Sequence, residues 1–292
     1  SSDVCSSDLE EYVNYEEVSR IKLRVLRMIF ESFCASNRQD RAKGVEWADF
    51  QNYVSNEGIF LERHATFCAL RDWLGSQDSR FLSWREWPAG YQNPQSDEVK
   101  HFVETYSDEI SFWMFIQWQI DVQLKDVQEH ALKIGMILGL YHDQALAVDS
   151  NGSDFWAWRE YFTDGFTVGA PPDSFAPEGQ DWGFCPPDSW KIRQSFYTPF
   201  RKILRANMKY GGALRIDHVM QLHHLFWIPK RAAPSEGVYV KDYESDLLNV
   251  LALESVAAKN LIVGEDLGTV PHNFRERLIE KGLLSYRLFY FE

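Results

Sequence analysis

An alternation of two patterns in the second half of the chain limits the fold more than any other feature. Short apolar runs, rich in β-branched and aromatic residues, are separated by stretches with helical periodicity. The runs lie at residues 136–143, 213–219, 260–268 and 285–291. Because consecutive parallel strands need a long crossover, usually a helix, this alternation predicts an α/β fold with a parallel sheet. The four predicted strands are half of the eight that a closed (β/α)8 barrel contains.

The first part of the chain, residues 10–132, shows helical patterns and no strand pattern. After an acidic start, apolar residues recur at helical spacing from Val18 to Phe33. Further helices are predicted at 46–54, 60–74 and 108–133. We therefore divide the chain into a helical subdomain at 10–132, which precedes the sheet or is inserted in it, and an α/β part at 133–292.

The α/β part contains one long segment without periodicity. It is rich in Gly, Pro, Ser and Asp, and we expect it to be a loop from Ser150 to about Ser189. Helices are predicted at 190–210, 246–259 and 272–282. The first nine residues, SSDVCSSDL, are polar and repetitive, so we expect residues 1–9 to be a non-native leader.

Composition narrows the class of function. The net charge of −13 opposes binding to nucleic acid and to anionic membranes, whereas a neutral ligand such as a sugar is compatible with it. Aromatic residues make up 15% of the chain and include 11 Trp. This content suits a protein that handles sugar rings, although packing in the core is the better explanation of any single Trp. No apolar stretch reaches the ~18 residues of a transmembrane helix.

The cysteines and the N-terminal region indicate a compartment. The four cysteines, Cys5, Cys34, Cys68 and Cys185, are widely spaced and form no CxxC pair. The N-terminus shows no basic segment followed by an apolar one, the pattern of a signal peptide. We therefore expect reduced thiols and a cytoplasmic location.

Polar residues end three of the apolar runs, at the edge of the sheet where (β/α) barrels carry their active sites. Asp143 ends the first run, Asp217 and His218 end the second, and Glu265 and Asp266 end the third. Since side chains alternate along a strand, Arg215 and Asp217 share one face, which we expect to point into the barrel mouth.

Two carboxyl groups on neighbouring strand ends are what retaining glycoside hydrolysis requires. An ionised carboxylate attacks the anomeric carbon while a protonated one, about 5–5.5 Å away, delivers a proton to the leaving oxygen. Neighbouring strands lie about 4.8 Å apart, so Asp217 and Glu265 fit as nucleophile and general acid/base. Arg215 would keep Asp217 ionised, whereas partial burial and the charges of Asp217 and Asp266 would keep Glu265 protonated. From spacing alone, an ordinary Arg215–Asp217 salt bridge with Glu265 on a loop is equally consistent.

Other chemistries find weaker support in the sequence. His218, His223 and His224 have no carboxylate in register, so we predict no metal site. The chain has no glycine-rich phosphate loop followed by Lys-Ser/Thr, and no Ser in a GxSxG setting. We therefore expect neither a metal nor another cofactor.

Three segments together resemble the amylomaltase, or 4-α-glucanotransferase, family (glycoside hydrolase family 77), and most of all its enteric-bacterial form, the disproportionating enzyme. They are GALRIDHVMQL at 212–222, LIVGEDLGTVP at 261–271 and VGAPPDSFAPEGQDWGFCPPD at 168–188. RIDH followed by GEDLGTVP is more specific than either motif alone, and the resemblance extends from about residue 11 to 292. It implies an enzyme that transfers α-1,4-glucan segments between maltooligosaccharides through a covalent glycosyl-aspartate, in a retaining double displacement.

The resemblance also assigns roles to single residues. Asp217 corresponds to the nucleophile and Glu265 to the acid/base. Substrate-binding positions are expected at Arg215, His218, Asp143, Gln180, Trp182 and Asp266. Trp182 is expected in a Gly-rich loop, where an indole is suited to stacking on a sugar ring, although packing on the core is nearly as consistent.

The pattern of the family is incomplete in this chain. The family has a third catalytic carboxylate, an Asp that usually follows a His near a later strand end, and this chain has no match for it. The chain also has no match for the Ser-Pro-Tyr loop that follows the first strand in the family. We therefore expect a partial (β/α)8 TIM barrel made of the middle strands only, in a chain truncated at both ends. Two alternatives remain open: an α-glucan hydrolase of the amylase type, and an inactive fragment or glucan-binding protein.

Overall fold

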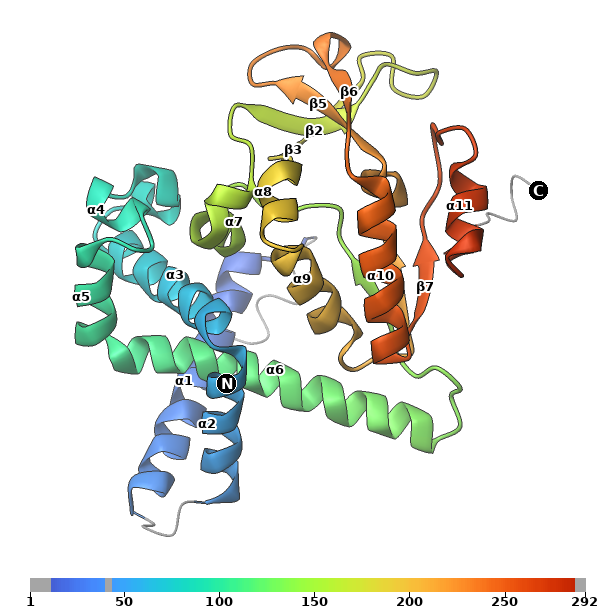
Figure 1. Ribbon diagram of the computed structural model, residues 1–292. Helices are drawn as coiled ribbons and strands as arrows, with labels where there is room; N and C mark the ends of the chain where they lie inside the picture. The colour runs from blue at the N-terminus through green and yellow to red at the C-terminus, as the bar shows by residue number, and fades with distance from the viewer. Residues whose placement is uncertain (1–11, 40–43, 287–292) are drawn as a thin grey trace.

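The computed structural model describes residues 12–39 and 44–286, which form a helical part and an α/β part lying side by side (Figure 1). The predicted leader at 1–9, including Cys5, and most of the last predicted strand at 285–291 lie outside the described residues. None of the helices within the described ranges is long and apolar enough to span a membrane.

Up to Lys133, every element in the described ranges is helical, in agreement with the periodicity of the sequence. The elements are α1 (Tyr15–Gln39), α2 (Val45–Glu57), α3 (Ile59–Gly75), the 3₁₀ turns η2 (Ser79–Leu82) and η3 (Trp84–Glu86), α4 (Ala89–Gln92), α5 (Asp97–Thr105) and α6 (Ser107–Lys133). The two 3₁₀ turns and α4 replace a regular helix where Pro and Gly interrupt the pattern.

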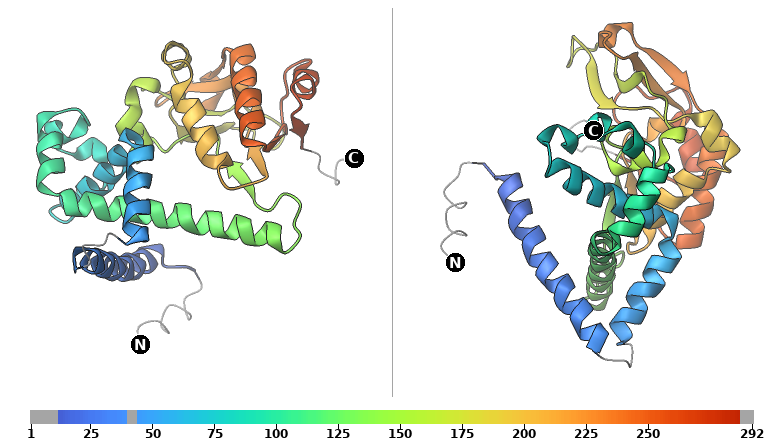
Figure 2. Two further views of the ribbon diagram at one scale, coloured as in Figure 1. Left: turned by 60° about the horizontal axis from the view of Figure 1, so that its bottom comes forward. Right: turned by 90° about the vertical axis from the view of Figure 1, so that its left-hand side faces the viewer.

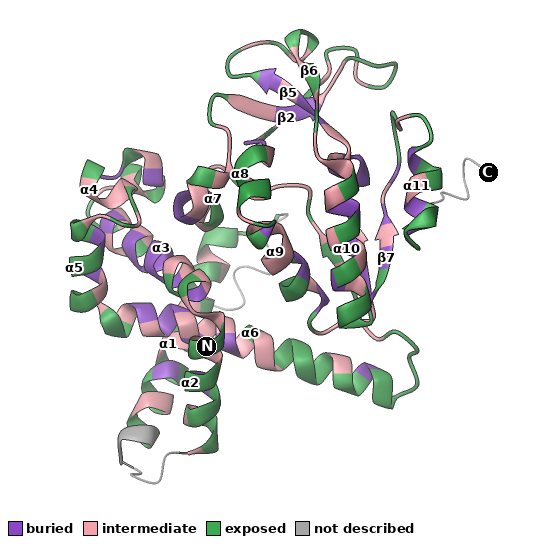
Figure 3. Cartoon of the chain, viewed as in Figure 1, coloured by how far each residue is buried: buried purple, intermediate pink, exposed green. Residues whose placement is uncertain are grey.

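The central helix of this part is α6, with α1, α2, α3 and α5 packed against it (Figure 2). Phe115 and Trp118 lie on one face of α6 because residues three apart are neighbours on a helix. The Phe115 ring lies 5.1 Å from that of Phe33 on α1, and the Trp118 ring 5.5 Å from that of Phe50 on α2, centroid to centroid. Each fully buried aromatic side chain contributes roughly 1.5–3 kcal/mol. The C-terminal half of α6 extends beyond this core and is mostly exposed (Figure 3).

The α/β part begins with β1 and contains two sheets. Its strands are β1 (Tyr141–Gln144), β2 (Phe166–Ala170), β3 (Gln180–Phe184), β4 (Ala213–Ile216), β5 (His224–Pro229), β6 (Val238–Lys241), β7 (Leu261–Gly264) and β8 (Leu284–Ser285). Its helices are α7 (Ser153–Trp158), α8 (Ser189–Gln194), α9 (Thr198–Met208), α10 (Glu244–Ala258) and α11 (Phe274–Glu280), with the 3₁₀ turns η4 (Arg159–Tyr161), η5 (Val219–Leu222) and η6 (Pro234–Glu236).

The first sheet is parallel, in the order β1-β4-β7-β8, as the alternating pattern predicted. Leu214 and Ile216 of β4 and Ile262 of β7 point to one face, where they form a buried core with residues of α9, α10 and α11. The intervening Arg215 and Val263, which are paired in register, point to the other face and are only partly buried. One face of the sheet therefore supplies the core, and the other is open to carry polar side chains.

The second sheet is antiparallel, in the order β3-β2-β5-β6, and sequence reasoning did not predict it. The expected loop from Ser150 to about Ser189 is wrong, because it contains α7, η4, β2 and β3. The expected single helix at 190–210 is also wrong. It is divided into α8 and α9 by a turn in which Phe196 and Tyr197 have left-handed backbones, with φ of 55° and 59°.

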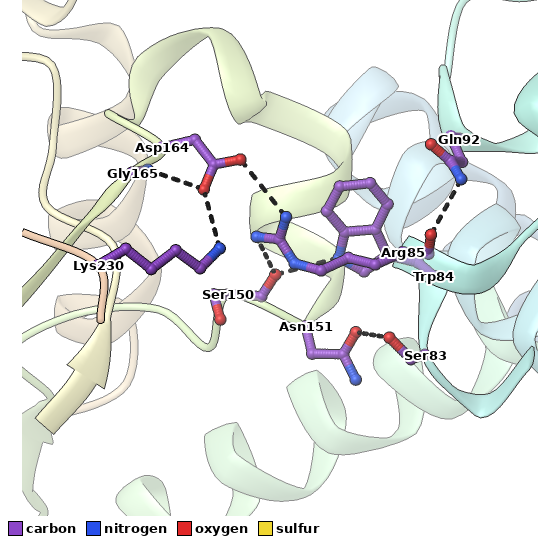
Figure 4. Close-up of polar contacts among 9 residues, drawn as sticks. All are labelled: Ser83, Trp84, Arg85, Gln92, Ser150, Asn151, Asp164, Gly165 and Lys230. Atoms are coloured by element: carbon purple, nitrogen blue, oxygen red, sulfur yellow. Dashed lines mark hydrogen bonds and ion pairs between the residues drawn. The ribbon is translucent and has the colours of Figure 1, made fainter. Parts of the chain in front are cut away.

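A polar cluster joins the helical part to the antiparallel sheet (Figure 4). Arg85 of η3 donates to the Ser150 carbonyl at 3.4 Å and pairs with Asp164, just before β2, at 3.5 Å. Lys230, just after β5, approaches the same carboxylate at 3.7 Å, and the Gly165 N–H donates to it at 3.0 Å. Burial raises the pKa of Asp164. The Gly165 N–H and the charges of Arg85 and Lys230 lower it by more, so the pKa lies below its ordinary value. The cluster fixes the antiparallel sheet against the helical part.

Gly169 sets the spacing between β2 and β3. A Cβ atom at this position would lie 1.9 Å from the Gln180 carbonyl oxygen, so Gly169→Ala must push β3 away. We expect the free energy of unfolding to fall by about 1–3 kcal/mol, as in other overpacked sites, measured by urea denaturation. The matched control on the same strand is Thr167→Val, which removes a buried hydroxyl that lacks a hydrogen-bond partner and should be neutral or stabilising. If Gly169→Ala and the parent chain had the same free energy of unfolding, the close approach of residue 169 to the Gln180 carbonyl would be contradicted.

Candidate active site

Three acidic residues lie at one edge of the parallel sheet, where β1, β4 and β7 end. Asp143 pairs in register with Arg215, and Ile216 pairs with Gly264, so Asp217 and Glu265 follow at the same level on neighbouring strands. The backbone ladder continues to both residues: the Asp217 N–H donates to the Gln144 carbonyl at 3.0 Å, and the Glu265 N–H donates to the Ile216 carbonyl at 2.9 Å. Glu265 is therefore held by the sheet rather than by a free loop.

Arg215 connects the first two acidic residues. Its Nη1 donates to Asp143 Oδ1 and its Nη2 to Asp217 Oδ1, each at 2.7 Å. Burial lowers the pKa of Arg215, but the hydrogen bond that it donates to Asp143 and the charge of Asp217 raise this pKa above its ordinary value. The side chain remains 21% exposed. The sequence predicted the pair with Asp217, and the structure adds Asp143 to it.

Backbone N–H groups hold the carboxyl group of Glu265. Oε2 accepts from the His218 N–H and Oε1 from the Leu267 N–H, each at 2.9 Å. The His218 backbone is left-handed, with a φ of 46°, a conformation that turns its N–H towards Glu265. The Val219 N–H also donates to the Glu265 carbonyl at 2.9 Å. The turn after β4 and the turn after β7 thus fix each other.

The antiparallel sheet brings Trp182 and Gln180 of β3 to this edge. The Trp182 ring lies edge-on to the His218 ring, with centroids 5.4 Å apart, and the indole Nε1–H donates to Gln180 Oε1 at 2.9 Å. Burial lowers the pKa of His218 although the charges of Glu265 and Asp217 raise it. The imidazole is therefore neutral at neutral pH and can both donate and accept hydrogen bonds.

Asp266 differs from the other predicted site residues. Its side chain is 1% exposed and accepts from Arg275 Nε at 2.6 Å, and the Tyr286 N–H donates to it at 3.1 Å. A substrate contact was expected here, and the structure corrects this expectation: alternation along the chain turns Asp266 to the helix side when Glu265 faces the open side. Asp266 anchors the turn that carries Glu265.

Two residues near the site were missed by sequence reasoning. Gln221 donates from Nε2 to the Asp217 carbonyl at 2.7 Å, and its place four residues after Asp217 was a usable signal. Tyr286 follows β8, and the guanidinium carbon of Arg215 lies 5.6 Å from the centre of its ring. Tyr286 continues the series of polar residues that end the strands of the sheet, and the same rule could have found it.

The histidines after β4 make protein contacts. Across the described ranges, no group of three or more His, Cys, Asp or Glu could hold a metal ion. His223 Nδ1 hydrogen-bonds to Glu244, which also pairs with Arg277. The His224 ring packs against that of Tyr239, with centroids 4.3 Å apart.

His224 makes the folded chain sensitive to acid. Burial, followed by the neighbouring His223, lowers the pKa of His224 from 6.5 to about 4. Between these two pH values the unfolded chain binds a proton that the folded chain does not, so stability falls as the pH drops through this window. At pH ~5.5 we expect a loss of at most about 1 kcal/mol from this residue, allowing for its partial exposure.

The measurement compares urea denaturation at pH ~7.5 and ~5.5 in the parent chain and in His224→Phe, which keeps a ring against Tyr239. His224→Phe should lose less stability on acidification. His101→Phe, at an exposed position of α5, is the control and should behave as the parent. If all three chains lost the same stability on acidification, His224 would bind its proton as readily in the folded chain as in the unfolded chain, and the prediction would be wrong.

Comparison with known proteins places this arrangement in a family. The sequence matches the family described as 4-alpha-glucanotransferase, within glycoside hydrolase family 77, over residues 2–292. It is 38% identical over 256 residues to the 4-alpha-glucanotransferase of Mycobacterium tuberculosis, covering 88% of this chain and 34% of that protein. It is 33% identical over 286 residues to that of Haemophilus influenzae, covering 96% of this chain and 40% of that protein. The chain thus spans less than half the length of these relatives.

A solved structure agrees with the sequence comparison. The crystal structure of amylomaltase from Corynebacterium glutamicum superposes with a TM-score of 0.76 at 32% identity, covering 94% of this chain and 35% of that one. Both the sequence and the fold therefore confirm the predicted family. The chain belongs to the 4-alpha-glucanotransferase family.

Proposed function

We propose that this chain supplies the two reacting carboxyl groups of an enzyme that transfers α-1,4-glucan segments between maltooligosaccharides. Asp217 attacks the anomeric carbon and forms a covalent glycosyl ester as the bond to the leaving glucan breaks. Glu265 gives its proton to the leaving oxygen and then takes a proton from the 4-hydroxyl of the acceptor sugar, which displaces Asp217. Two inversions at one carbon retain its configuration.

The observation that carries this proposal is the state of the Asp217 carboxylate. Oδ1 is fixed by Arg215 at 2.7 Å, whereas no hydrogen bond to Oδ2 is found among the described residues. One oxygen is thus held and the other is left to react. Positioning of this kind supplies a large part of the rate in displacement reactions.

The contacts of Glu265 are compatible with its proposed role. Each carboxyl oxygen has two acceptor sites, and each accepts one backbone N–H. One position on each oxygen therefore remains for a proton or a substrate oxygen. The Glu265 carboxyl group cannot rotate without breaking both contacts, which favours a fixed direction of proton transfer.

The surrounding residues provide the contacts that a sugar needs. Trp182 offers an indole face, His218 a neutral imidazole, and Gln180 and Asp143 polar groups at the rim. Rings with polar partners suit the apolar faces and equatorial hydroxyls of glucose. We propose that these residues bind the donor glucan beside Asp217, and that the reaction needs no metal or cofactor.

The architecture proposed for this site is part of a (β/α)8 barrel, with β1, β4, β7 and β8 as neighbouring middle strands. In such barrels, reacting groups come from the carboxyl ends of several strands. The helical subdomain at 10–132 would be an addition to the barrel part at 133–292.

The test uses the full gene product, incubated with maltotriose, and separates the products by length. Transfer yields a ladder of longer and shorter maltooligosaccharides, which Asp217→Asn must not produce. Glucose and maltose without longer products would instead indicate hydrolysis and contradict the proposal. A ladder formed equally by Asp217→Asn would remove Asp217 from the mechanism.

A further inference from the structure

A cavity lies on the helix side of the parallel sheet, on the face opposite to the Asp217 side chain. Its volume is about 310 Å³, and its floor includes Gln144 of β1 and Ile216 of β4. Alternation along the strands turns these two side chains away from Asp143 and Arg215. Gln144 also accepts a hydrogen bond from Asn207 of α9 at 2.6 Å, on the helix side of the sheet. The lining includes Gln221, which donates to the Asp217 carbonyl, but none of the side chains of Asp143, Arg215, Asp217 and Glu265. The cavity therefore borders the site from the helix side and does not contain its charged groups.

The cavity lies where the helical part meets the α/β part. Phe60 of α3 and Trp158 of α7 form one wall, with stacked rings whose centroids are 4.5 Å apart. Ile203 and Ala206 of α9 also line the cavity. These side chains give the cavity an apolar and aromatic lining. Since polyols need a polar partner for most of their hydroxyls, the lining suits an apolar ligand better than a sugar.

Charged groups break the apolar lining at a few positions. Three carboxylates, Glu57, Asp154 and Asp242, and one ammonium group, Lys202, line the cavity. The Lys202 Nζ lies 5.0 Å from the centre of the Phe60 ring, in a cation–π contact. Glu57 is within 3.8 Å of Lys209 Nζ. The excess of acidic groups favours a cationic ligand.

Among the described residues, Asp154 is the one of these three carboxylates without a hydrogen bond or ion pair. Asp242 accepts from the Ser189 hydroxyl at 2.7 Å and from the Tyr243 N–H at 2.6 Å. No hydrogen bond or ion pair to the Asp154 carboxylate is found in the part of the chain that the structure describes. Asp154 is an exposed residue, so water reaches its carboxylate. The protein around it raises its pKa, and the charge of His64 acts in the opposite direction. A cation in the cavity would replace this water as the partner of the carboxylate.

We propose that this cavity binds a small organic amine, with its ammonium group on Asp154 and its apolar body between the Phe60–Trp158 pair and α9. The volume is at the lower end of the ~300–1,000 Å³ of small-molecule pockets, which limits the ligand to about ten heavy atoms. The ammonium group forms a charge-assisted hydrogen bond, and the body replaces water against apolar walls.

The test measures the binding of three probes of similar size by isothermal titration calorimetry: 2-phenylethylamine, 2-phenylethanol and 3-phenylpropanoate. The parent chain should bind the amine about tenfold more tightly than the alcohol, the effect of one partly exposed charged hydrogen bond, and the anion most weakly. In Asp154→Asn the preference for the amine should disappear while the affinity for the alcohol changes less than about twofold.

Two further variants test whether the preference for the amine depends on this cavity or follows from the loss of any carboxylate. Asp97→Asn removes a 95% exposed carboxylate on α5 and should keep the preference for the amine. Ala206→Trp fills the cavity from α9 and should weaken binding of the amine and the alcohol alike, with folding checked by circular dichroism. The proposal is overturned if the parent binds amine and alcohol equally, if Asp154→Asn keeps the tenfold preference, or if a folded Ala206→Trp binds as the parent does.

Discussion

Replacing Asp217 by Asn is expected to lower the rate of transfer from maltotriose by at least about 10³-fold, as for other covalent nucleophiles. An amide oxygen is too weak a nucleophile to form the glycosyl ester, and the step has no other carboxylate held in the same direction. The fold should persist, because Asn keeps an oxygen that can accept from Arg215. The measurement is the initial rate of maltooligosaccharide formation by the full gene product.

The matched control is Asp78→Asn. Asp78 also pairs with an arginine two residues away at 2.7 Å, but it lies in the helical part, at the start of η2. Losing that pair should change the rate less than about twofold, because the pair is exposed to solvent and lies outside the site. A rate for Asp217→Asn within about tenfold of the parent would show that the nucleophile is another group.

Replacing Glu265 by Gln is expected to lower the rate from maltotriose by about 10²–10⁴-fold, the usual contribution of a general acid. Gln has one oxygen and one NH₂ group, so one of the two N–H donors, at His218 or Leu267, also loses its acceptor. The rate on maltotriose alone would not separate a lost proton from a disturbed turn.

A donor whose leaving group needs no proton distinguishes the loss of proton transfer from a disturbed turn. α-Maltosyl fluoride releases fluoride ion, so its first step does not need the Glu265 proton. Glu265→Gln should release fluoride in a burst close to one equivalent of enzyme and then slowly, because the base for the second step is missing. The absence of any burst would mean that Glu265 orients the site and does not transfer the proton.

The parallel sheet and its acidic edge could be predicted because both depend on local patterns. Each strand is a short apolar run that ends in a polar residue, and alternation then assigns Arg215 and Asp217 to one face. The same rule places Asp266 on the face opposite to Glu265, which disfavours a substrate contact for Asp266. The structure shows Asp266 buried and paired with Arg275.

The antiparallel sheet could not be predicted because its first two strands carry no clear apolar pattern. β2 (FTVGA) and β3 (QDWGF) are short segments in a stretch rich in Gly and Pro, so no local alternation marks them. The break between α8 and α9 had one local signal, Pro199 in the first turn of α9. The left-handed backbones of Phe196 and Tyr197 had none, since both are residues that rarely adopt a positive φ.

The covalent bond to Asp217 is the claim on which the whole mechanism depends. Glu265→Gln in the full gene product, mixed with α-maltosyl fluoride and stopped in acid during the burst, should gain the mass of one maltosyl unit. Peptide mapping should place that unit on the segment that contains Asp217, as an ester that alkali removes. A fluoride burst without any gain in mass, or with the sugar on another residue, would contradict the proposed nucleophile.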